Sequence, residues 1–295
     1  MNIAGPGIPR LLLAAPGMRP ALVLVGVALL AGGCVGAAVL FPAEPRPGSV
    51  YHSLQKPDGE GPFPAVVLLH TCGGLQQHVL EWAQRLRAHE YVALVLDSFT
   101  PRGQKSVCGN WRVSLDEVAA DAFAALEHLR TRPFVDGQRI GVMGFSYGAM
   151  ATLRLTSASY RGAGHPRGAS FGAAVALYPY CTDRRPSLPP DARDRLNNLY
   201  DDVDTPLLIL VAGADDQAPP ASCTEKAEAL GRAGRPVSFK LYQGAPHAFD
   251  MTNMGTTGRR DAQGHFYRYD PGVTADAAKV SLEFLDRHLP KPNRQ

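Results

Sequence analysis

The segment Gly144-Phe145-Ser146-Tyr147-Gly148 carries the strongest chemical signal in this 295-residue sequence. It has the pattern Gly-X-Ser-X-Gly, and it lies where an apolar run typical of a strand gives way to the spacing of a helix. A serine on such a sharp turn exposes its hydroxyl, and small flanking residues allow the turn to close. The helix that follows offers backbone N–H groups to a developing negative charge. The pattern therefore predicts that Ser146 is a nucleophile.

A serine nucleophile needs a base, and the base needs an acid that orients it. His247, in the segment GAPHAFD after the last predicted strand, is placed to take the serine proton and return it to a leaving group. Asp215 or Asp216, in the turn after another predicted strand, is placed to accept a hydrogen bond from the imidazole, with Asp215 preferred. Aspartates in a polar turn also cap helices, so a structural role is the alternative for this pair.

The glycine-rich segment His70-Thr71-Cys72-Gly73-Gly74 follows the first buried run of apolar residues. In hydrolases with a Gly-X-Ser-X-Gly turn, one oxyanion donor comes from such a loop and the other from the residue after the serine. We expect the N–H groups of Cys72 and Tyr147 to be these donors. Each would be worth about 3 kcal/mol to a transition state. Cys72 itself lacks the strand-to-helix context of a nucleophile.

The rest of the sequence predicts a scaffold that brings these residues together. Short β-branched and Leu-rich runs alternate with amphipathic stretches, which is typical of an α/β fold with a mostly parallel central sheet and helices on both faces. Such sheets bind ligands at the carboxyl ends of their strands. An edge strand is also expected within residues 46–56. The predicted strands are residues 65–70, 92–98, 139–145, 172–178, 206–213 and 238–243, and the predicted helices are residues 76–89, 113–130, 147–156, 222–233 and 274–288.

Two loops at these strand ends, residues 179–204 and 247–271, are longer than ordinary connections, and such loops are commonly functional. Arg102, and Arg184 or Arg185, are candidates for gripping a substrate carboxylate, because a guanidinium binds carboxylates bidentately. Solvated loop arginines are the alternative interpretation. The aromatic side chains that could form apolar walls of the site are Phe145, Tyr147, Tyr178, Tyr180 and Phe249. A phenylalanine on the strand before the serine is more often a core residue, which is the alternative for Phe145.

Residues 21–41 carry no charge, and two arginines precede them. As a helix this stretch matches the hydrocarbon core of a bilayer, so it is interpreted as a signal anchor or a cleaved signal peptide. A buried core helix is the alternative, but such helices seldom stay uncharged for so long. LAGGC, ending at Cys34, also resembles a bacterial lipobox. We expect residues 1–46 to be a targeting segment and linker, and residues 47–295 to be one catalytic domain, exported to the periplasm or another extracytoplasmic compartment. Membrane contact is expected through the N-terminal segment only, and a net charge of +3 does not suggest nucleic acid as a partner.

Four further cysteines, an even number, suggest disulfides in an exported protein. In the usual strand order of such a fold, the loops that hold Cys72 and Cys108 follow neighbouring strands, and so do the loops that hold Cys181 and Cys223. We predict these two pairings, the first of which would brace the oxyanion loop. No Cys-X-X-Cys or Cys/His cluster is present, so we expect no metal and no other cofactor.

Six segments together resemble one known family: HTCGGL, DSFTPRG, RIGVMGFSYGAM, LYPYC, GADDQAPP and GAPHAFD, in this order and spacing, look like the dienelactone hydrolase family over about residues 50–290. The resemblance implies an α/β-hydrolase core without a large lid domain, with nucleophile, acid and histidine on Ser146, Asp215 and His247. Asp215 is preferred because the family's acid stands four residues before a proline, as Asp215 does before Pro219. The family's namesake has cysteine in place of Ser146, so an ester or lactone other than dienelactone is expected.

The prediction is therefore a serine hydrolase that cleaves small carboxylic esters or lactones through an acyl-enzyme intermediate. The alternative from another class is a catalytically inactive binding or scaffold protein of the cell envelope with the same fold. A peptidase is a further alternative, because the same triad cleaves amides. No propeller or sizeable cap segment is present to select peptides.

Overall fold

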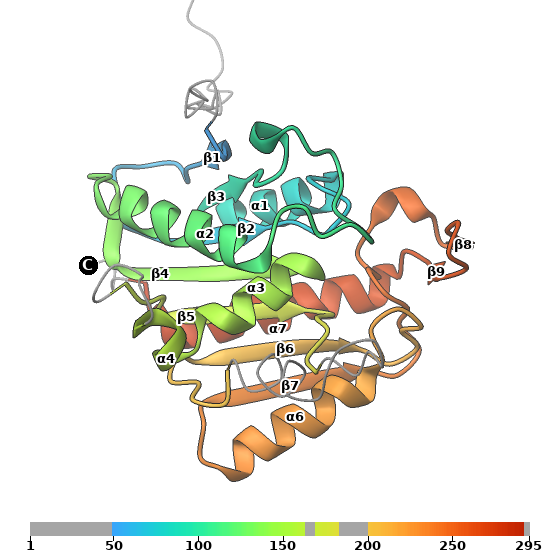
Figure 1. Cartoon of the computed structure of the whole chain (residues 1–295). Coiled ribbons are helices and arrows are strands. Elements are labelled where there is room, and N and C mark those ends of the chain that lie inside the picture. Colours follow the sequence, from blue (N-terminus) through green and yellow to red (C-terminus); the bar gives the residue numbers. More distant parts are fainter. Residues whose placement is uncertain (1–48, 163–168, 183–199, 292–295) are drawn as a thin grey trace, which may run out of the picture. The chain divides into compact units, whose positions relative to one another are not determined.

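The computed structural model describes residues 49–162, 169–182 and 200–291 (Figure 1). The predicted targeting segment and the candidate residues Arg184 and Arg185 lie outside these ranges. Within the same ranges, no helix is both long and apolar enough to cross a membrane.

A seven-stranded sheet in the described residues has the order β1-β3-β2-β4-β5-β6-β7. All neighbouring strands from β3 to β7 pair in parallel, whereas β1 pairs antiparallel with β3 at one edge. The predicted edge strand and the mostly parallel sheet are confirmed. The strands are β1 (Tyr51–Gln55), β2 (Phe63–Leu69), β3 (Val92–Leu96), β4 (Val135–Phe145), β5 (Ala173–Leu177), β6 (Leu207–Ala212) and β7 (Val237–Tyr242).

Helices cover both faces of this sheet, as predicted. Figure 1 shows α2 and α3 in front of the sheet and α7 behind it. The side chains of α2, α3 and α6 share one hydrophobic cluster, and those of α1 and α7 share another. The helices are α1 (Gln77–Ala88), α2 (Leu115–Arg130), α3 (Tyr147–Leu155), α4 (Ala158–Gly162), α6 (Pro220–Arg232) and α7 (Pro271–His288), with short 3-10 turns η1 (Thr100–Arg102) and η2 (Thr252–Met254).

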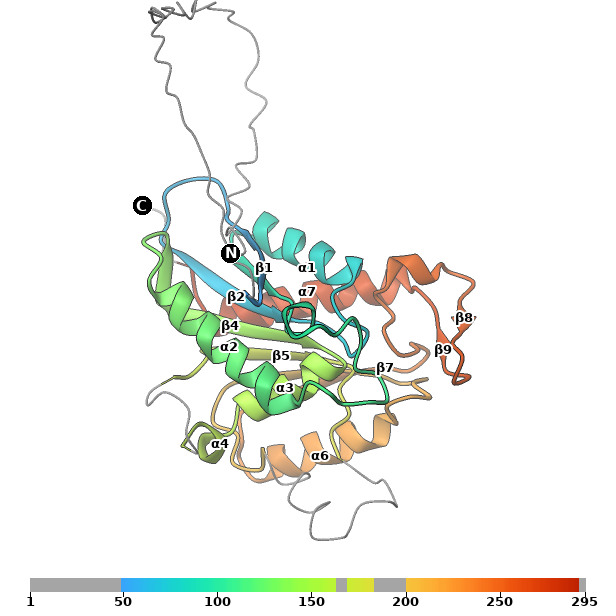
Figure 2. The same cartoon turned by 45° about the horizontal axis from the view of Figure 1, so that its top comes forward.

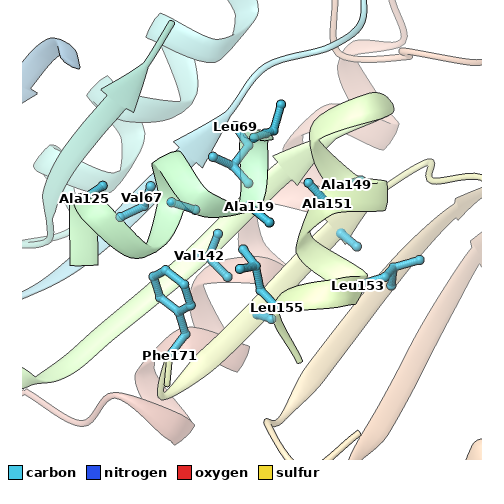
Figure 3. Close-up of a cluster of buried hydrophobic side chains, with 14 of the residues drawn as sticks. Val67, Leu69, Ala119, Ala125, Val142, Ala149, Ala151, Leu153, Leu155 and Phe171 are labelled. Carbon is cyan, nitrogen blue, oxygen red and sulfur yellow. The ribbon is translucent and has the colours of Figure 1, made fainter. Parts of the chain in front are cut away.

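Alternation along each strand divides the core between the two faces. On β2, Val67 joins the cluster beneath α2 and α3, while its neighbour Val66 joins the cluster beneath α1 and α7. Figure 3 shows Val67 and Leu69 of β2 with Val142 of β4 among side chains of α2 and α3. Strands β2, β3, β5 and β6 are buried throughout, which explains why they read as continuous apolar runs.

Capping residues set the start of two helices differently from the prediction. Helix α2 begins at Leu115 because the Ser114 side chain accepts from the N–H of Glu117, and the Glu117 carboxylate accepts from the N–H of Ser114 at 2.8 Å. Helix α7 begins three residues earlier than expected, at Pro271. Asp270 caps it by accepting from the N–H of Val273 at 3.0 Å, and proline suits the first helical position.

Both predicted disulfides are confirmed. Cys72 in the loop after β2 pairs with Cys108 in the loop after β3, and Cys181 after β5 pairs with Cys223 on α6. The long loop after His247 is also more ordered than a plain connection, because it contains η2 and a two-stranded hairpin of β8 (Arg259–Arg260) and β9 (Phe266–Tyr267). Figure 2 shows this hairpin at the end of the sheet where the parallel strands terminate.

Candidate active site

The turn between β4 and α3 holds Ser146 in a backbone conformation that residues with a side chain rarely adopt. Its φ is 51° and its ψ is −106°. Such a conformation costs about 1–3 kcal/mol and persists only where the surroundings impose it. The N–H of Ser146 donates to the carbonyl oxygen of Leu177 at 3.0 Å, and the Ser146 carbonyl accepts from the N–H of Met150 at 3.0 Å. These two bonds tie the serine to strand β5 and to helix α3.

The two glycines of the turn are required by close backbone contacts. A Cβ on Gly144 would lie 2.3 Å from the carbonyl oxygen of Gly148, and a Cβ on Gly148 would lie 2.2 Å from the carbonyl oxygen of Leu69. Both separations are too short for any side chain. The N–H of Gly148 also donates to the carbonyl oxygen of His70 at 3.0 Å, which fixes the start of α3 against the end of β2.

The predicted base and acid lie in line with the serine. Nε2 of His247 is 2.9 Å from Oγ of Ser146, and Nδ1 of His247 is 2.6 Å from Oδ2 of Asp215. The other carboxylate oxygen of Asp215 accepts from the N–H groups of Gln217 and Ala218 at 2.9 and 2.7 Å. This arrangement places the imidazole proton on Nδ1 and leaves Nε2 free to accept from the serine hydroxyl. His247 and Asp215 are buried, so water does not compete for these contacts.

Asp216 makes its contacts with the β8–β9 hairpin. Its carboxylate accepts from the N–H of Phe266 at 3.1 Å and pairs with Arg260 at 3.3 Å and with His265 at 3.5 Å. Of the two neighbouring aspartates, Asp215 therefore contacts His247, and Asp216 holds the β8–β9 hairpin.

A buried polar cluster of Tyr178, Asp250 and Trp82 packs against His247, and sequence reasoning missed it. The ring of Tyr178 meets that of His247 edge to face, with centroids 5.0 Å apart. Tyr178 donates its hydroxyl to Asp250 at 2.7 Å, and Trp82 donates its indole N–H to the other oxygen of Asp250 at 2.7 Å. Burial raises the pKa of Tyr178 well above its ordinary value, so it remains a neutral donor. A carboxylate three residues after His247, in an otherwise apolar segment, was the available signal.

Two cavities meet at the serine and the histidine. The larger, about 720 Å³, extends along α3, and the smaller, about 400 Å³, extends toward the loop that follows His247. Ser146, His247 and Cys72 line both of them. No group of three or more His, Cys, Asp or Glu side chains in the described part of the chain is arranged to hold a metal ion.

The predicted oxyanion donors, Cys72 and Tyr147, lie beside the serine. Tyr147 is the first residue of α3, and N–H groups in a first helical turn have no acceptor within the helix. Cys72 is held by its disulfide to Cys108 and by a hydrogen bond from the N–H of Val107 to its carbonyl oxygen at 2.8 Å. Both residues line the larger cavity.

His70 fixes the start of the same loop. One ring nitrogen lies 2.8 Å from the carbonyl oxygen of Thr71, and the other accepts from the N–H of Ser98 at 3.2 Å. Burial lowers the pKa of His70, so the ring stays neutral and keeps both roles.

Comparison with known proteins gives the family of this chain. The family model for the dienelactone hydrolase family matches residues 50–289. The chain belongs to the dienelactone hydrolase family. It is a carboxylic ester hydrolase of that family, as predicted.

Relatives of this dienelactone hydrolase family member are distant in sequence but alike in fold. A Methylorubrum extorquens protein with the provisional name carboxymethylenebutenolidase is 25% identical over 244 residues, spanning 79% of this chain and 78% of that protein. The structure of the Thermogutta terrifontis esterase Est2 with butyrate bound has a TM-score of 0.60 at 20% identity, covering 82% of this chain and 91% of that one. The same esterase phosphorylated by paraoxon has a TM-score of 0.59 at 20% identity, covering 81% of this chain and 90% of that one.

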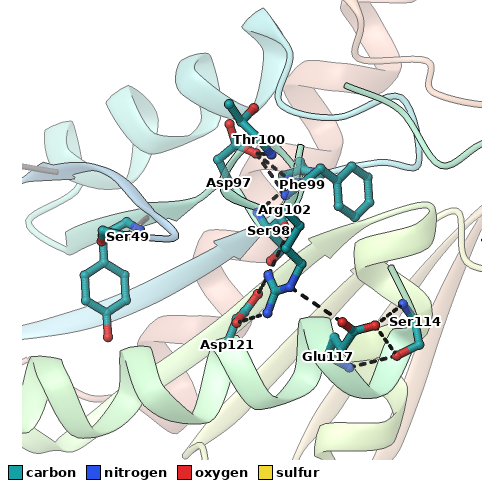
Figure 4. Close-up of polar contacts among 11 residues, drawn as sticks. Ser49, Asp97, Ser98, Phe99, Thr100, Arg102, Ser114, Glu117 and Asp121 are labelled. Carbon is teal, nitrogen blue, oxygen red and sulfur yellow. Dashed lines mark hydrogen bonds and ion pairs between the residues drawn. The ribbon is translucent and has the colours of Figure 1, made fainter. Parts of the chain in front are cut away.

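The prediction that Arg102 binds a substrate carboxylate is wrong. Its guanidinium donates to both oxygens of Asp121, at 2.8 and 2.9 Å, and to the carbonyl oxygen of Ser98 at 2.7 Å, and it lies 3.6 Å from Glu117 (Figure 4). Arg102 lines neither cavity at the serine. The arginine connects η1 to α2 and is occupied by carboxylates of the protein itself.

The predicted aromatic walls are partly wrong as well. Phe249 is fully buried and packs against the rings of Tyr178 and Tyr242, because a φ of 52° at Ala248 turns the chain inward directly after His247. Phe145 and Tyr178 are core residues too. Tyr147 and Tyr180 do line the larger cavity. Burial raises the pKa of Tyr147 to about 12, and its hydroxyl donates to the carbonyl oxygen of Val113 at 2.6 Å.

The larger cavity is also lined by a charged residue that sequence reasoning missed. Arg154, in the last turn of α3, is only 9% exposed. Its closest carboxylate is that of Asp116, with Nε and Oδ1 3.8 Å apart. The available signal was one arginine inside the otherwise uncharged helix YGAMATLRL.

Proposed function

We propose that this enzyme hydrolyses small carboxylic esters or lactones through an acyl-enzyme on Ser146. The observation that carries the proposal is the continuous hydrogen-bonded line from Ser146 through His247 to Asp215, at the junction of two cavities. This is the arrangement that converts a weak serine nucleophile into a strong one.

In the first half of the reaction, Oγ of Ser146 attacks the ester carbonyl carbon while Nε2 of His247 takes its proton. Asp215 accepts from Nδ1 and stabilises the imidazolium that forms. The carbonyl oxygen becomes an oxyanion, which the N–H groups of Cys72 and Tyr147 stabilise. When the tetrahedral intermediate collapses, the alcohol oxygen leaves with the proton from His247, and the acyl group remains on Ser146.

In the second half, a water molecule takes the place of the alcohol. His247 accepts a proton from this water as its oxygen attacks the acyl carbon, and the same two N–H groups hold the second oxyanion. Collapse releases the carboxylic acid and returns the proton to Ser146. With a lactone, the alcohol and the acid are parts of one molecule, so the ring opens.

Three properties of two relatives support this substrate class. The Thermogutta terrifontis esterase Est2 binds butyrate and is phosphorylated by paraoxon, and the Methylorubrum extorquens relative carries the name of a lactone hydrolase. Because Ser146 stands where the family's namesake has cysteine, we propose an ester or lactone other than dienelactone.

The test compares the hydrolysis of p-nitrophenyl acetate and butyrate by the full-length protein and by Ser146→Ala. We expect turnover by the parent protein and background rates from the variant. An inactive scaffold protein would give background rates from both. A peptidase would cleave peptide anilides at least as well as these esters.

We further propose that residues 47–295 form one catalytic domain that works outside the cytoplasm. The uncharged segment 21–41 either anchors this domain to the membrane or is cleaved from it as a signal peptide. The two disulfides support this proposal, because disulfides persist in oxidising compartments. Protease treatment of intact and permeabilised cells tests it. If the protein is digested only after the outer membrane has been permeabilised, while the inner membrane stays intact, a periplasmic location is supported. Protection of the protein by the intact inner membrane would contradict it.

A further inference from the structure

Arg154 is a buried cation whose hydrogen-bonding capacity the protein leaves partly unused. Its Nε and Nη1 are buried and have no hydrogen-bond partner among the described residues. Its side chain is 10% exposed, and burial lowers its pKa from the ordinary value for arginine. A buried charge with unsatisfied hydrogen-bond donors costs free energy, so an anionic ligand that supplies the missing acceptors is bound favourably there.

The nearest carboxylate is a poor internal partner. Asp116 lies 3.8 Å from Nε of Arg154, beyond hydrogen-bonding distance, and its side chain is 71% exposed. The same Oδ1 accepts from the hydroxyl of Tyr160 at 2.9 Å. By contrast, Arg102 forms two hydrogen bonds to Asp121. The fold can therefore pair an arginine bidentately, and it does not do so at Arg154.

Arg154 lies in the cavity that fits the acyl part of a substrate. The alcohol must receive its proton from His247, so it leaves on the side of the histidine loop, where Ala248, Met251 and Met254 line the smaller cavity. The larger cavity runs along α3, the helix that starts immediately after the nucleophile. Its lining includes the apolar side chains of Met150 and Leu153 with Tyr180, and Asp116, the carboxylate beside Arg154, lines it too.

We propose that Arg154 binds a carboxylate at the far end of the acyl group, so that the preferred substrates are half-esters of dicarboxylic acids with an apolar spacer. The proposal rests on the proposed function and specifies its substrate class. Arg154 follows Ser146 by eight residues, about 12 Å along a helix at 1.5 Å per residue, and helical side chains lean back toward the N-terminus. The spacer must therefore contain several carbon atoms.

The experiment measures kcat/KM of the full-length protein for p-nitrophenyl half-esters of dicarboxylic acids, with about two to eight methylene groups, at a pH where the free carboxyl is ionised. Neutral p-nitrophenyl alkanoates of equal chain length are the reference. We expect the half-ester to be preferred by about 10- to 100-fold at an intermediate spacer length, as a charge-assisted hydrogen bond to a buried partner would give. In Arg154→Met this ratio falls to about one or below.

Matched variants separate recognition from general effects. Arg112→Met removes the same charge from an exposed side chain that itself lines neither cavity, and we expect the wild-type ratio. Arg154→Lys keeps the charge without the planar fork, and we expect an intermediate ratio. If Arg154→Met does not fold, the preference for half-esters across the spacer series, measured in the wild-type protein and in Arg154→Lys, still tests the proposal.

Three results would overturn the proposal: equal rates for half-esters and neutral esters at every length, an unchanged ratio in Arg154→Met, or an anionic preference only when the carboxylate is on the alcohol side, as in 4-acetoxybenzoate. These outcomes leave the hydrolase itself intact, because neutral esters are still cleaved and Ser146→Ala still abolishes cleavage. Failure of the proposed function is different, because no ester of either kind would be cleaved.

Discussion

The reaction centre and the far end of the larger cavity are built in opposite ways. At the reaction centre, both ring nitrogens of His247 and both oxygens of Asp215 have partners within the protein. At the far end, two nitrogens of Arg154 have none in the described residues. The difference suggests that the protein positions the groups that move protons with its own contacts, and leaves a substrate to complete the contacts that select it.

The largest expected effect comes from removing an internal partner at the reaction centre. Asp215→Asn keeps the shape of the side chain but no longer stabilises the correct tautomer and the imidazolium of His247, so kcat should fall by about 10,000-fold. The matched variant is Asp216→Asn, because the Asp216 carboxylate contacts the β8–β9 hairpin, whereas Asp215 contacts His247. We expect it to change kcat by no more than a few-fold. Similar losses in the two variants, measured with p-nitrophenyl butyrate, would contradict the assignment of Asp215.

The two disulfides separate support of the reaction centre from support of the fold. They close loops of similar length, with sequence separations of 36 and 42, so removing either should cost up to about 4 kcal/mol of unfolding free energy. Only Cys72 carries a proposed oxyanion donor. We therefore expect the double variant Cys72→Ala/Cys108→Ala to lose about tenfold more kcat than Cys181→Ala/Cys223→Ala. Urea denaturation and ester kinetics on the same samples check both parts.

Stability measurements on two arginines test the far end of the cavity. Arg102→Met leaves the buried Asp121 unpaired and should reduce the free energy of unfolding by about 3 kcal/mol. Arg154→Met removes a buried charge whose Nε and Nη1 have no hydrogen bond among the described residues and whose contact with the exposed Asp116 is 3.8 Å long. It should therefore leave stability unchanged or raise it by about 1 kcal/mol. Thermal and urea unfolding of both variants measure this contrast. A large loss of stability in Arg154→Met would show that the protein, and not a ligand, uses the guanidinium.

The smallest expected effect concerns His78, a second buried group without hydrogen-bond partners among the described residues. Burial lowers the pKa of His78 from its ordinary 6.5, so the unfolded chain takes up a proton at a higher pH than the folded chain does. Stability should therefore be greatest above about pH 6.5 and fall as the pH decreases below it, by up to about 1.4 kcal/mol per pH unit. His70 contributes in the same direction. We expect a shallower decline in His78→Leu, measured by urea denaturation between pH 5 and pH 7.5.

Sequence reasoning succeeded where a residue's role follows from its place along the chain. The turn at Ser146 follows from two glycines between a strand and a helix, and the cysteine pairs follow from loops after neighbouring strands. The approximate positions of the helices and strands follow from hydrophobic periodicity.

It failed where the direction of a side chain depends on tertiary packing. The surroundings of the Arg102 and Arg154 side chains are set by the tertiary fold and not by neighbouring residues in the sequence. The first turns toward Asp121 on α2, and the second enters a cavity whose walls come from several loops. Phe249 lies in the core, directly after the positive φ at Ala248. An alanine in the sequence does not predict a positive φ. The hydrogen bonds to Asp250 join side chains 72 and 168 residues away in sequence, beyond the reach of local patterns.

Covalent labelling with an organophosphate tests whether Ser146 is the nucleophile. Paraoxon, which phosphorylates the Thermogutta terrifontis esterase 2, would be incubated with the folded full-length protein, followed by peptide mapping by mass spectrometry. We expect one diethylphosphoryl group, on the peptide that contains Ser146, with loss of ester hydrolysis in proportion to labelling and slow labelling in His247→Ala. Ester hydrolysis that continues after Ser146 is fully labelled, or a label on another residue that tracks the loss of activity, would contradict it.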